Sequence, residues 1–267
     1  MKEAYQDDDD ELPTVASSVS SVPLVVDTKG VNPATLDVGD KVVILGQSRS
    51  GKTTLIERLV HDNHHKFNAI WAFCGTIAVS QNYLWNEPFI IQLNAPVQLG
   101  EDGHVTQIKK IIRLQEVVAE TCREKGEPIP PMLLIFDDCL CMDFYKDSTF
   151  WGGWLSNLRH YAISVIFSIQ TPNRTIPPGM RSQTDKEYLF TSRADSKLVT
   201  SMIPPLHYQG KAYTGQAAYD MICKLLAVKF QCLFFDSLNG VHGHLFTAVP
   251  TKPFTISYGA RSKVLHM

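Results

Sequence analysis

The chain has 267 residues, of which 44% are hydrophobic and 19% are charged, with 25 Lys and Arg against 27 Asp and Glu. A chain of this length can bury roughly 70 to 75% of the surface that its unfolded form exposes, so it needs no disulfide framework or structural metal to stay folded. It contains no apolar run of about 18 residues, and its first residues are acidic where a signal peptide would be basic and then apolar. Composition therefore argues against a secreted protein and against a membrane span.

Acidic residues are concentrated at the N-terminus. Residues 1–11 hold six of them and one Lys, which leaves 24 basic and 21 acidic residues in the rest of the chain. An excess of about +3 neither supports nor excludes a nucleic-acid partner. We expect residues 1–21, which are Asp-rich and then Ser-rich, to form a disordered tail. Residues 22–267 should fold as one domain, with a core at about 40–195 and a C-terminal extension at about 196–267.

Apolar runs of strand length alternate with longer helical runs along the core. We expect strands at 41–46, 69–75, 88–93, 132–138, 162–170 and 187–192, and helices at 53–62, 104–126 and 149–161. The runs 132–138 and 162–170 are apolar at consecutive positions, which is typical of strands covered on both faces. The pattern predicts an α/β fold with a mostly parallel central sheet flanked by helices.

The C-terminal extension has a different pattern. We expect helices at 194–203 and 215–228, followed by two strands at 230–236 and 244–249 that form an antiparallel hairpin. The six cysteines of the chain show no C-x-x-C pair, and several lie in apolar runs where a thiol packs as a small hydrophobic group. We interpret all six as reduced, as in a cytosolic protein.

The segment GQSRSGKT matches the P-loop pattern G-x-x-x-x-G-K-[ST], and it lies directly between a predicted strand and a predicted helix. Glycines allow the loop to turn its N–H groups towards a phosphate, and the helix adds the positive end of its dipole. We expect Lys52 to neutralise the β- and γ-phosphates and the Thr53 hydroxyl to bind Mg²⁺. The predicted ATP-binding residues are Gly46, Gln47, Ser48, Arg49, Ser50, Gly51, Lys52, Thr53 and Thr54.

A second acidic site is needed for Mg²⁺ and for the attacking water. The apolar run 132–138 ends in Asp137 and Asp138, as a Walker B strand does. We expect Asp137 to hold Mg²⁺ through water and Asp138 to orient or deprotonate the hydrolytic water. Asp236, at the end of another strand, competes for this role, and Asp138 could instead cap the following turn.

Gln170 ends the predicted strand 162–170. If this strand neighbours the Walker B strand, the side chain would reach the γ-phosphate or the attacking water, because strand ends in open α/β sheets face the ligand crevice. We therefore interpret Gln170 as a catalytic sensor of the phosphate. The alternative is a glutamine that begins a proline-rich loop.

The segments GQSRSGKT, LLIFDD and NLRHYAISVIFSIQTPNRTIPPGMRSQTD together resemble the DNA-packaging ATPases of large eukaryotic DNA viruses, the poxvirus-type branch of the FtsK/HerA superfamily. The resemblance covers about residues 40–195. Its most specific part is an Arg-His pair before a strand, a Gln at the end of that strand, and then P-P-x-x-R. The chain departs from the pattern at Asp138, where many relatives carry Glu, at Arg49, and over its C-terminal third.

This resemblance implies a ring of identical subunits that hydrolyses ATP with Mg²⁺ and drives double-stranded DNA into a preformed capsid. Capsid or portal vertex proteins would be further partners, and the protein would act in the host cytoplasm, at the viral assembly site, or in the virion. Ring motors complete the site with an arginine from the neighbouring subunit. We favour Arg159 for this catalytic role; the other candidates are Arg174, Arg181 and Arg193.

Two other functions are compatible with a P-loop. A small-molecule or nucleoside kinase would need an arginine-rich lid, for which PNRTIPPGMR is the only candidate, whereas a scaffold would bind ATP without turning it over. Other conspicuous residues have simpler interpretations. The three histidines near position 63 lack the spacing of a metal site, and the four tryptophans suit a core or a subunit interface: His61, His64 and His65; Trp71, Trp85, Trp151 and Trp154.

Overall fold

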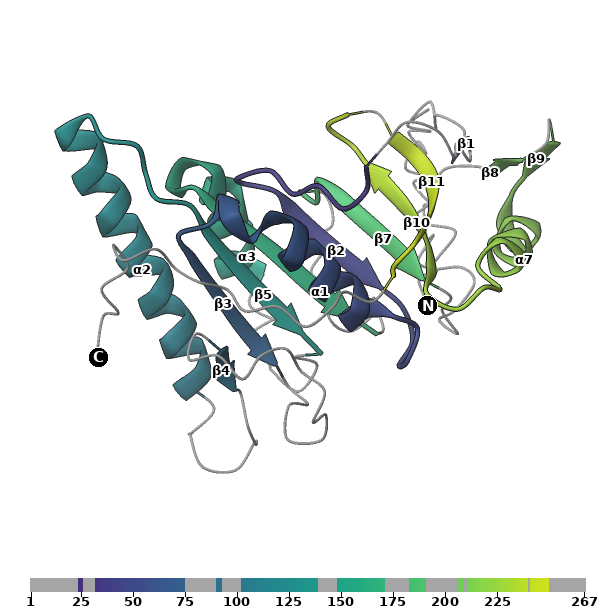
Figure 1. Ribbon diagram of the computed structural model, residues 1–267, viewed down its shortest axis with the longest axis horizontal. Coiled ribbons are helices and arrows are strands. Elements are labelled where there is room, and N and C mark those ends of the chain that lie inside the picture. Colours follow the sequence, from purple (N-terminus) through teal and green to yellow (C-terminus); the bar gives the residue numbers. More distant parts are fainter. Residues whose placement is uncertain are drawn as a thin grey trace, which may run out of the picture.

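The computed structural model describes residues 24–25, 32–74, 90–92, 102–138, 148–170, 183–190, 206–208, 211–239 and 241–249 (Figure 1). The predicted tail at 1–21 and the predicted helix at 194–203 lie outside these residues. Within them, no helix combines the length and the apolar character that a membrane span requires.

An eight-stranded sheet forms the centre of the molecule, in the order β11-β10-β7-β2-β6-β5-β3-β4 (Figure 1). Six neighbouring strands are parallel, and β10 and β11 pair antiparallel at one side. The bounds are β2 (Lys41–Leu45), β3 (Ala69–Cys74), β4 (Ile90–Gln92), β5 (Met132–Asp137), β6 (Ile163–Ile169), β7 (Lys186–Phe190), β10 (Gln231–Asp236) and β11 (Val241–Thr247). The predicted fold, a mostly parallel α/β sheet with a C-terminal antiparallel hairpin, is confirmed.

Helices cover both faces of this sheet. The first helix, α1 (Lys52–Asn63), packs its apolar side on one face through Leu55, Ile56 and Leu59. The other face is covered by α2 (Asp102–Lys125), α3 (Ser148–Asn157) and α7 (Gly215–Leu225). Because both faces are covered, β5 and β6 are buried along their whole length, which explains their continuous apolar sequence.

Short elements complete the description. A small separate sheet has the order β1-β8-β9, from β1 (Leu24–Val25), β8 (Leu206–Tyr208) and β9 (Lys211–Tyr213). Two short 3-10 helices, η1 (His64–Lys66) and η3 (Leu158–Tyr161), extend α1 and α3. The small sheet was not predicted, because strands of two or three residues carry no periodicity that a sequence could show.

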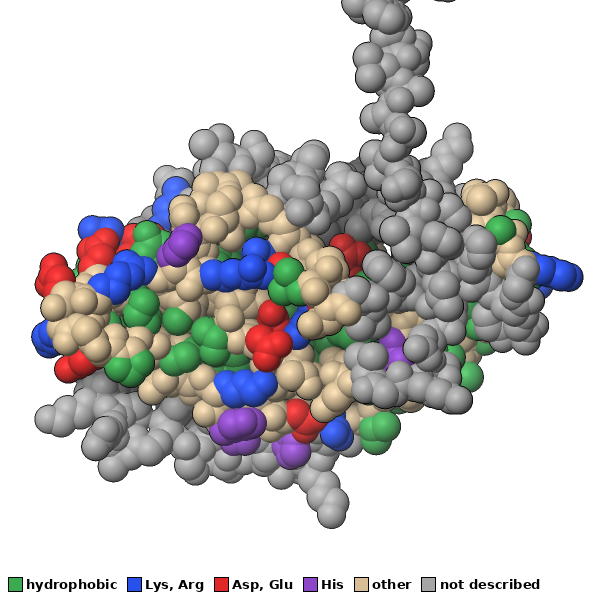
Figure 2. Space-filling view, turned by 90° about the horizontal axis from the view of Figure 1, so that it is seen from above, with side chains coloured by type: hydrophobic (Ala, Val, Ile, Leu, Met, Phe, Trp, Pro, Cys, Tyr) green, Lys and Arg blue, Asp and Glu red, His purple; other side chains and the backbone are tan. Residues whose placement is uncertain are grey.

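The edge at which the parallel strands begin carries charges of both signs. The strands β2, β3 and β5 run downwards in Figure 1, so the view from above in Figure 2 looks onto this edge. Among the described residues of this face, Lys and Arg are interspersed with Asp and Glu rather than gathered into a patch of one sign (Figure 2). This mixture agrees with the nearly balanced charge of the whole chain.

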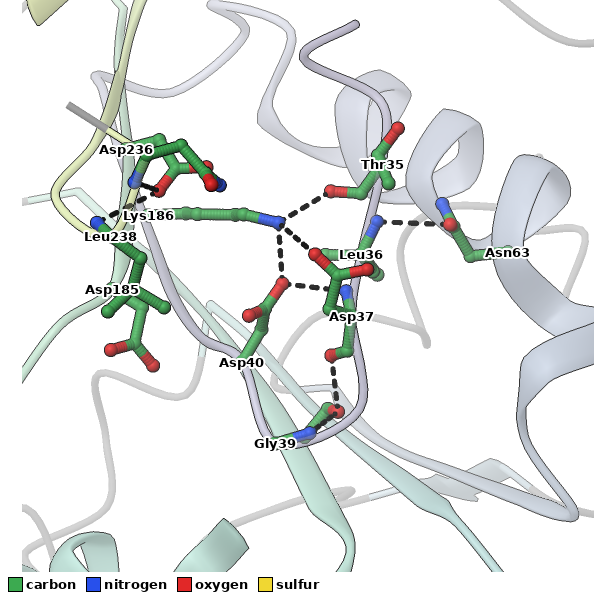
Figure 3. Close-up of polar contacts among 12 residues, drawn as sticks. Thr35, Leu36, Asp37, Gly39, Asp40, Asn63, Asp185, Lys186, Asp236 and Leu238 are labelled. Atoms are coloured by element: carbon green, nitrogen blue, oxygen red, sulfur yellow. Dashed lines mark hydrogen bonds and ion pairs between the residues drawn. The ribbon is translucent and has the colours of Figure 1, made fainter. Parts of the chain in front are cut away.

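A buried ionic network ties the segment before β2 to this edge (Figure 3). The ammonium of Lys186, at the start of β7, donates to Asp40 Oδ2 at 2.6 Å, to the Thr35 carbonyl at 3.0 Å and to Asp37 Oδ2 at 3.4 Å. Both Lys186 and Asp40 are almost fully buried. Asn63, at the end of α1, accepts from the Leu36 N–H at 3.0 Å and so fastens the same segment to the helix. The start of β2, and with it the loop at its other end, is held in place.

Candidate nucleotide-binding site

The P-loop lies at the carboxyl edge of the sheet, where β2 ends at Leu45. The Gly46 N–H donates to the Ile169 carbonyl of β6 at 3.1 Å, and Gly51 has a φ of 114°, which favours glycine. A Cβ at Gly46 would lie 2.6 Å from Ser50 Oγ and 2.7 Å from Phe190 Cβ. Glycine is therefore required at both ends of the loop, and α1 begins directly after it with its N–H groups directed at the loop.

Lys52, the first residue of α1, is only 7% exposed. Its ammonium donates to the carbonyls of Gly46 and Gln47 at 2.9 and 3.0 Å, so the side chain folds back over the loop. Burial lowers the pKa of this ammonium, and the charges of Asp137 and Asp138 oppose that shift. A buried cation over a loop of N–H groups is a site for a polyphosphate.

Thr53 and Asp137 meet across the site. Thr53 Oγ1 donates to Asp137 Oδ2 at 3.1 Å, and Asp137 is almost fully buried at the end of β5. Beside them in β6 lies Ser168, whose buried Oγ has no hydrogen-bond partner among the described residues. Hydroxyl and carboxylate oxygens are the ligands that Mg²⁺ prefers. These residues fit the ion, and Thr53 and Asp137 would hold it.

Asp138 and Gln170 form the second polar pair. Gln170 Nε2 donates to Asp138 Oδ1 at 2.7 Å, so the two strand ends lie side by side as the sequence predicted. Asp138 has a φ of 52°, an uncommon conformation that often marks a functional residue. Burial and the charge of Asp137 raise the pKa of the Asp138 carboxyl, although Lys52 and Gln170 act in the opposite direction. A carboxyl with a raised pKa is suited to accepting a proton.

Glu57 is a residue of this site that the sequence analysis missed. It lies one helical turn after Thr53 on α1, and its carboxyl is partly buried near Asp137. Burial and the charge of Asp137 raise the pKa of Glu57 to about 7. The spacing of four residues from Thr53 was the available signal, since residues i and i+4 share one face of a helix.

Arg159 lies at the opposite edge of the sheet. It belongs to η3, which precedes β6, whereas the P-loop contacts the end of β6; the strand has seven residues and so separates the two by about 20 Å. Its guanidinium pairs with Asp185 at 2.9 Å, and its stem packs on Gly39. Arg159 is therefore too far from the P-loop of its own chain to contact a phosphate bound there. The alternatives Arg174, Arg181 and Arg193 lie outside the described residues.

The competing interpretation of Asp236 does not fit the structure. Because β10 runs antiparallel to β7, Asp236 pairs in register with Lys186, at the edge far from the P-loop. Its carboxylate accepts instead from the N–H groups of Leu238 and Asn239 at 3.0 Å each. Among the described residues, including the histidines of α1 and η1, no cluster of three or more His, Cys, Asp or Glu side chains is placed to hold a metal ion.

Other side chains agree with the interpretations made from the sequence. Trp154 is buried in the core, Trp71 is partly buried against it, and Trp151 lies in α3. Trp85 lies outside the described residues. The cysteines Cys122, Cys223 and Cys232 are free thiols.

Comparison with known families identifies the chain. The family model of the poxvirus A32 protein matches residues 36–202, which is more than half of the sequence and includes every residue of the site. The chain belongs to the poxvirus A32 family. Protein 075L of Invertebrate iridescent virus 6 is 26% identical over 68% of this chain and 68% of its own length. Protein 015R of Frog virus 3 is 23% identical over 84% of this chain and 66% of its own length.

Solved structures share the fold of this A32-family chain. The DNA-packaging ATPase B204 of Sulfolobus turreted icosahedral virus aligns with a TM-score of 0.51 at 15% identity, over 81% of this chain and all of B204. The pCW3 conjugation coupling protein TcpA, solved with ATPγS, aligns with a TM-score of 0.52 at 14% identity, over 79% of this chain and 60% of TcpA. ATPases 2 and 3 of Thermomonospora curvata EccC align with a TM-score of 0.54 at 13% identity, over 90% of this chain and 42% of that structure. The chain thus shares the α/β fold of these proteins.

Proposed function

We propose that this protein is a Mg²⁺-dependent ATPase that moves double-stranded DNA, and that it packages a viral genome into a preformed capsid. The observation that carries the proposal is the meeting of three features at one edge of the sheet. These are the buried Lys52 over the P-loop, the Thr53–Asp137 contact and the Asp138–Gln170 contact. Together they supply what phosphoryl transfer to water requires: a phosphate cradle, a metal site and a base.

Each residue has a distinct task in this reaction. The loop N–H groups and Lys52 would bind the phosphates, and Thr53 and Asp137 would hold Mg²⁺, which would supply positive charge for the phosphate oxygens. Asp138 orients the attacking water and accepts its proton. Gln170 donates to one oxygen of Asp138 and so leaves the other oxygen to face the water. Loss of the γ-phosphate on hydrolysis would therefore alter the Asp138–Gln170 contact before other contacts of the site.

Our proposal of a DNA substrate and of an oligomeric ring is based on the family to which the chain belongs. Membership of the A32 family, and a fold shared with the DNA-packaging ATPase B204, support a packaging motor. We place the protein in a ring of identical subunits, with Arg159 supplied to the neighbouring site, at the viral assembly site in the host cytoplasm or in the virion. Capsid or portal proteins would anchor such a ring.

The Asp138–Gln170 contact also weighs against a kinase. A kinase must exclude water and present an acceptor, whereas we infer that this pair, at the end of two neighbouring strands, orients a water. The segment PNRTIPPGMR, which a kinase would use as a lid, lies outside the described residues.

Displacement of a third strand from a DNA triplex tests the proposal, because only a protein that travels along the duplex removes the strand. We expect displacement that needs ATP and Mg²⁺ and is lost in Asp138→Asn. The exposed Leu238→Asn variant, whose site lies in the hairpin turn far from the P-loop, should retain it. ATP hydrolysis without displacement would reduce the proposal to an ATPase with another task.

A further inference from the structure

A tight turn of the C-terminal extension lies beside the P-loop. It joins α7 to β10 and is closed by a hydrogen bond from the Gln231 N–H to the Val228 carbonyl at 3.1 Å. Because β10 is antiparallel to β7, with Cys232 opposite Phe190, the turn lies at the same edge of the sheet as the P-loop. The Ala248 N–H donates to the Phe230 carbonyl at 2.9 Å, which brings the end of the hairpin to the same place.

The turn packs directly on the phosphate loop. A Cβ at Gly51 would lie 2.6 Å from Phe230 Cδ1 and 3.3 Å from both Phe230 Cα and Phe190 Cε1. Phe230 itself has a φ of 66°, a conformation that is rare for a bulky side chain. Such strain persists only where the surroundings enforce it, and it clusters at ligand sites. The Phe230 ring is thus held against the loop at a conformational cost.

The order of the strands shows which end of ATP would come near this turn. Thr53 meets Asp137, and Asp138 meets Gln170, on the side of the P-loop where β6 and β5 lie. In the proposed reaction the γ-phosphate of ATP would have to lie on that side, next to these residues. The nucleoside is at the other end of the triphosphate, so it would leave the loop on the opposite side, towards β7 and β10, where the turn is.

The surface of the turn suits a nucleoside. Val228 is 60% exposed, and Val249, which directly follows the residue bonded to Phe230, is 57% exposed. The Lys229 ammonium lies 4.8 Å from the centre of the Phe230 ring. Exposed apolar side chains next to a cation and a phosphate loop match an aromatic base attached to an anion.

We propose that the turn Val228–Gln231 and Val249 form the wall against which the nucleoside of bound ATP packs. The inference rests on the proposed nucleotide function and extends it to a part of the chain beyond the P-loop motif. It also gives the C-terminal extension a role, since α7 and the hairpin hold this wall beside the loop. Nucleotide exchange would then act on the extension as well as on the core.

Comparison of two ligands tests the inference. Mg²⁺-ATP has a nucleoside and Mg²⁺-tripolyphosphate has none, so calorimetric titration with both separates contacts to the base from contacts to the phosphates. The double variant Val228→Asn/Val249→Asn should weaken ATP binding about five- to tenfold and change tripolyphosphate binding less than twofold. The matched control is Leu238→Asn, which lies 55% exposed at the far end of the same hairpin and should change neither.

Three results would overturn the inference. The double variant could bind ATP as tightly as the control does, it could lose both ligands equally, or the wild type could bind ATP no more tightly than tripolyphosphate. A wild type that binds neither ligand would instead overturn the proposed function itself. The two failures are therefore distinguishable in one set of titrations.

Discussion

At the scale of single residues, Lys52 and Asp138 lie at the same edge of the sheet, and in the proposed reaction they act on different atoms of ATP. Lys52 lies over the P-loop, whereas Asp138, which has a positive φ, contacts Gln170. Binding and hydrolysis should therefore be separable by substitution. This separation follows from the geometry, because Lys52 begins the helix α1 whereas Asp138 directly follows the strand β5.

Lys52→Ala should abolish ATP binding or weaken it more than a hundredfold, since the phosphates lose their buried cation. Asp138→Asn should keep ATP binding within a few fold and lower the hydrolysis rate by about 10² to 10⁴, the usual contribution of a general base. Titration with ATP and assay of released phosphate measure the two effects. Hydrolysis by Asp138→Asn at the wild-type rate would remove Asp138 from the mechanism.

Glu187 is a second residue whose environment leads to a measurable effect. It lies in β7 between Val43 and Phe235 of the neighbouring strands, and burial raises the pKa of its carboxyl to about 7. The ionised form is therefore disfavoured in the folded chain. The free-energy cost of ionising Glu187 in the folded chain is absent below the pKa of the unfolded chain, near 4.5. This cost grows as the pH rises to about 7.

Glu187→Gln should accordingly stabilise the protein by about 2 to 3 kcal/mol at pH 8 and by about 1 kcal/mol or less at pH 5. Urea unfolding at the two pH values measures the difference. Glu127→Gln, at an exposed carboxyl, is the control and should change little at either pH. Equal effects of Glu187→Gln at pH 5 and pH 8 would contradict the raised pKa.

At the scale of elements, the segment 33–40 is fixed to β7 and α1 by the network around Lys186 (Figure 3). Burial alone would lower the pKa of the Lys186 ammonium, but the hydrogen bond and charge of Asp40 and the charges of Asp37 and Asp236 raise it above its ordinary value. Burial raises the pKa of the Asp40 carboxyl, and the hydrogen bond and charge of Lys186 oppose that shift. Removal of one partner would leave an uncompensated charge in the interior.

Lys186→Met should therefore destabilise the protein by about 3 to 5 kcal/mol. The double variant Lys186→Met/Asp40→Asn should cost clearly less than the sum of the two single variants, because the unpaired carboxylate has been removed as well. Urea unfolding of the four proteins gives the coupling energy. Additive effects would show that the two groups do not act as a pair.

The same scale shows what the sequence could predict. The apolar runs predicted the bounds of the strands β2, β3, β5 and β6 closely, because a continuous apolar run is typical of a strand that is buried on both faces. The P-loop and Walker B patterns gave Lys52 and Asp137, since their spacing is local. Contacts between segments far apart in the sequence, which depend on the order of the strands, could not be predicted. Nothing in the spacing of Phe230 and Gly51 shows that β10 lies beside the P-loop.

At the scale of the whole molecule, the position of Arg159 about 20 Å from its own P-loop makes an assembly test decisive. Rings mixed from Asp138→Asn and Arg159→Ala subunits should regain part of the ATPase activity that each variant lacks, at interfaces where both residues are intact. Arg113→Ala, at an exposed site on α2, is the control and should stay active alone. No recovery in rings shown to be mixed would exclude Arg159 as the shared arginine.

Because Arg159 also pairs with Asp185, its loss could act through folding instead. Unfolding of Arg159→Ala by urea distinguishes the two effects. Arg159 is half exposed, and the buried Asp185 keeps the Lys41 ammonium as a partner at 3.5 Å, so the stability should fall by only about 1 kcal/mol while the activity falls by a large factor. A large loss of stability would make the Asp185 pair the main role of this arginine.

The central claim is that ATP hydrolysis is coupled to double-stranded DNA, and the ATPase rate with and without long duplex DNA tests it most directly. We expect duplexes of unrelated sequence to stimulate hydrolysis alike, because no base-reading motif is present in the sequence and a motor contacts phosphates. The stimulation should fall steeply with salt, as counterion release requires, and Asp138→Asn should show none. A rate that duplex DNA leaves unchanged at low salt, or that responds to one sequence only, would contradict the account.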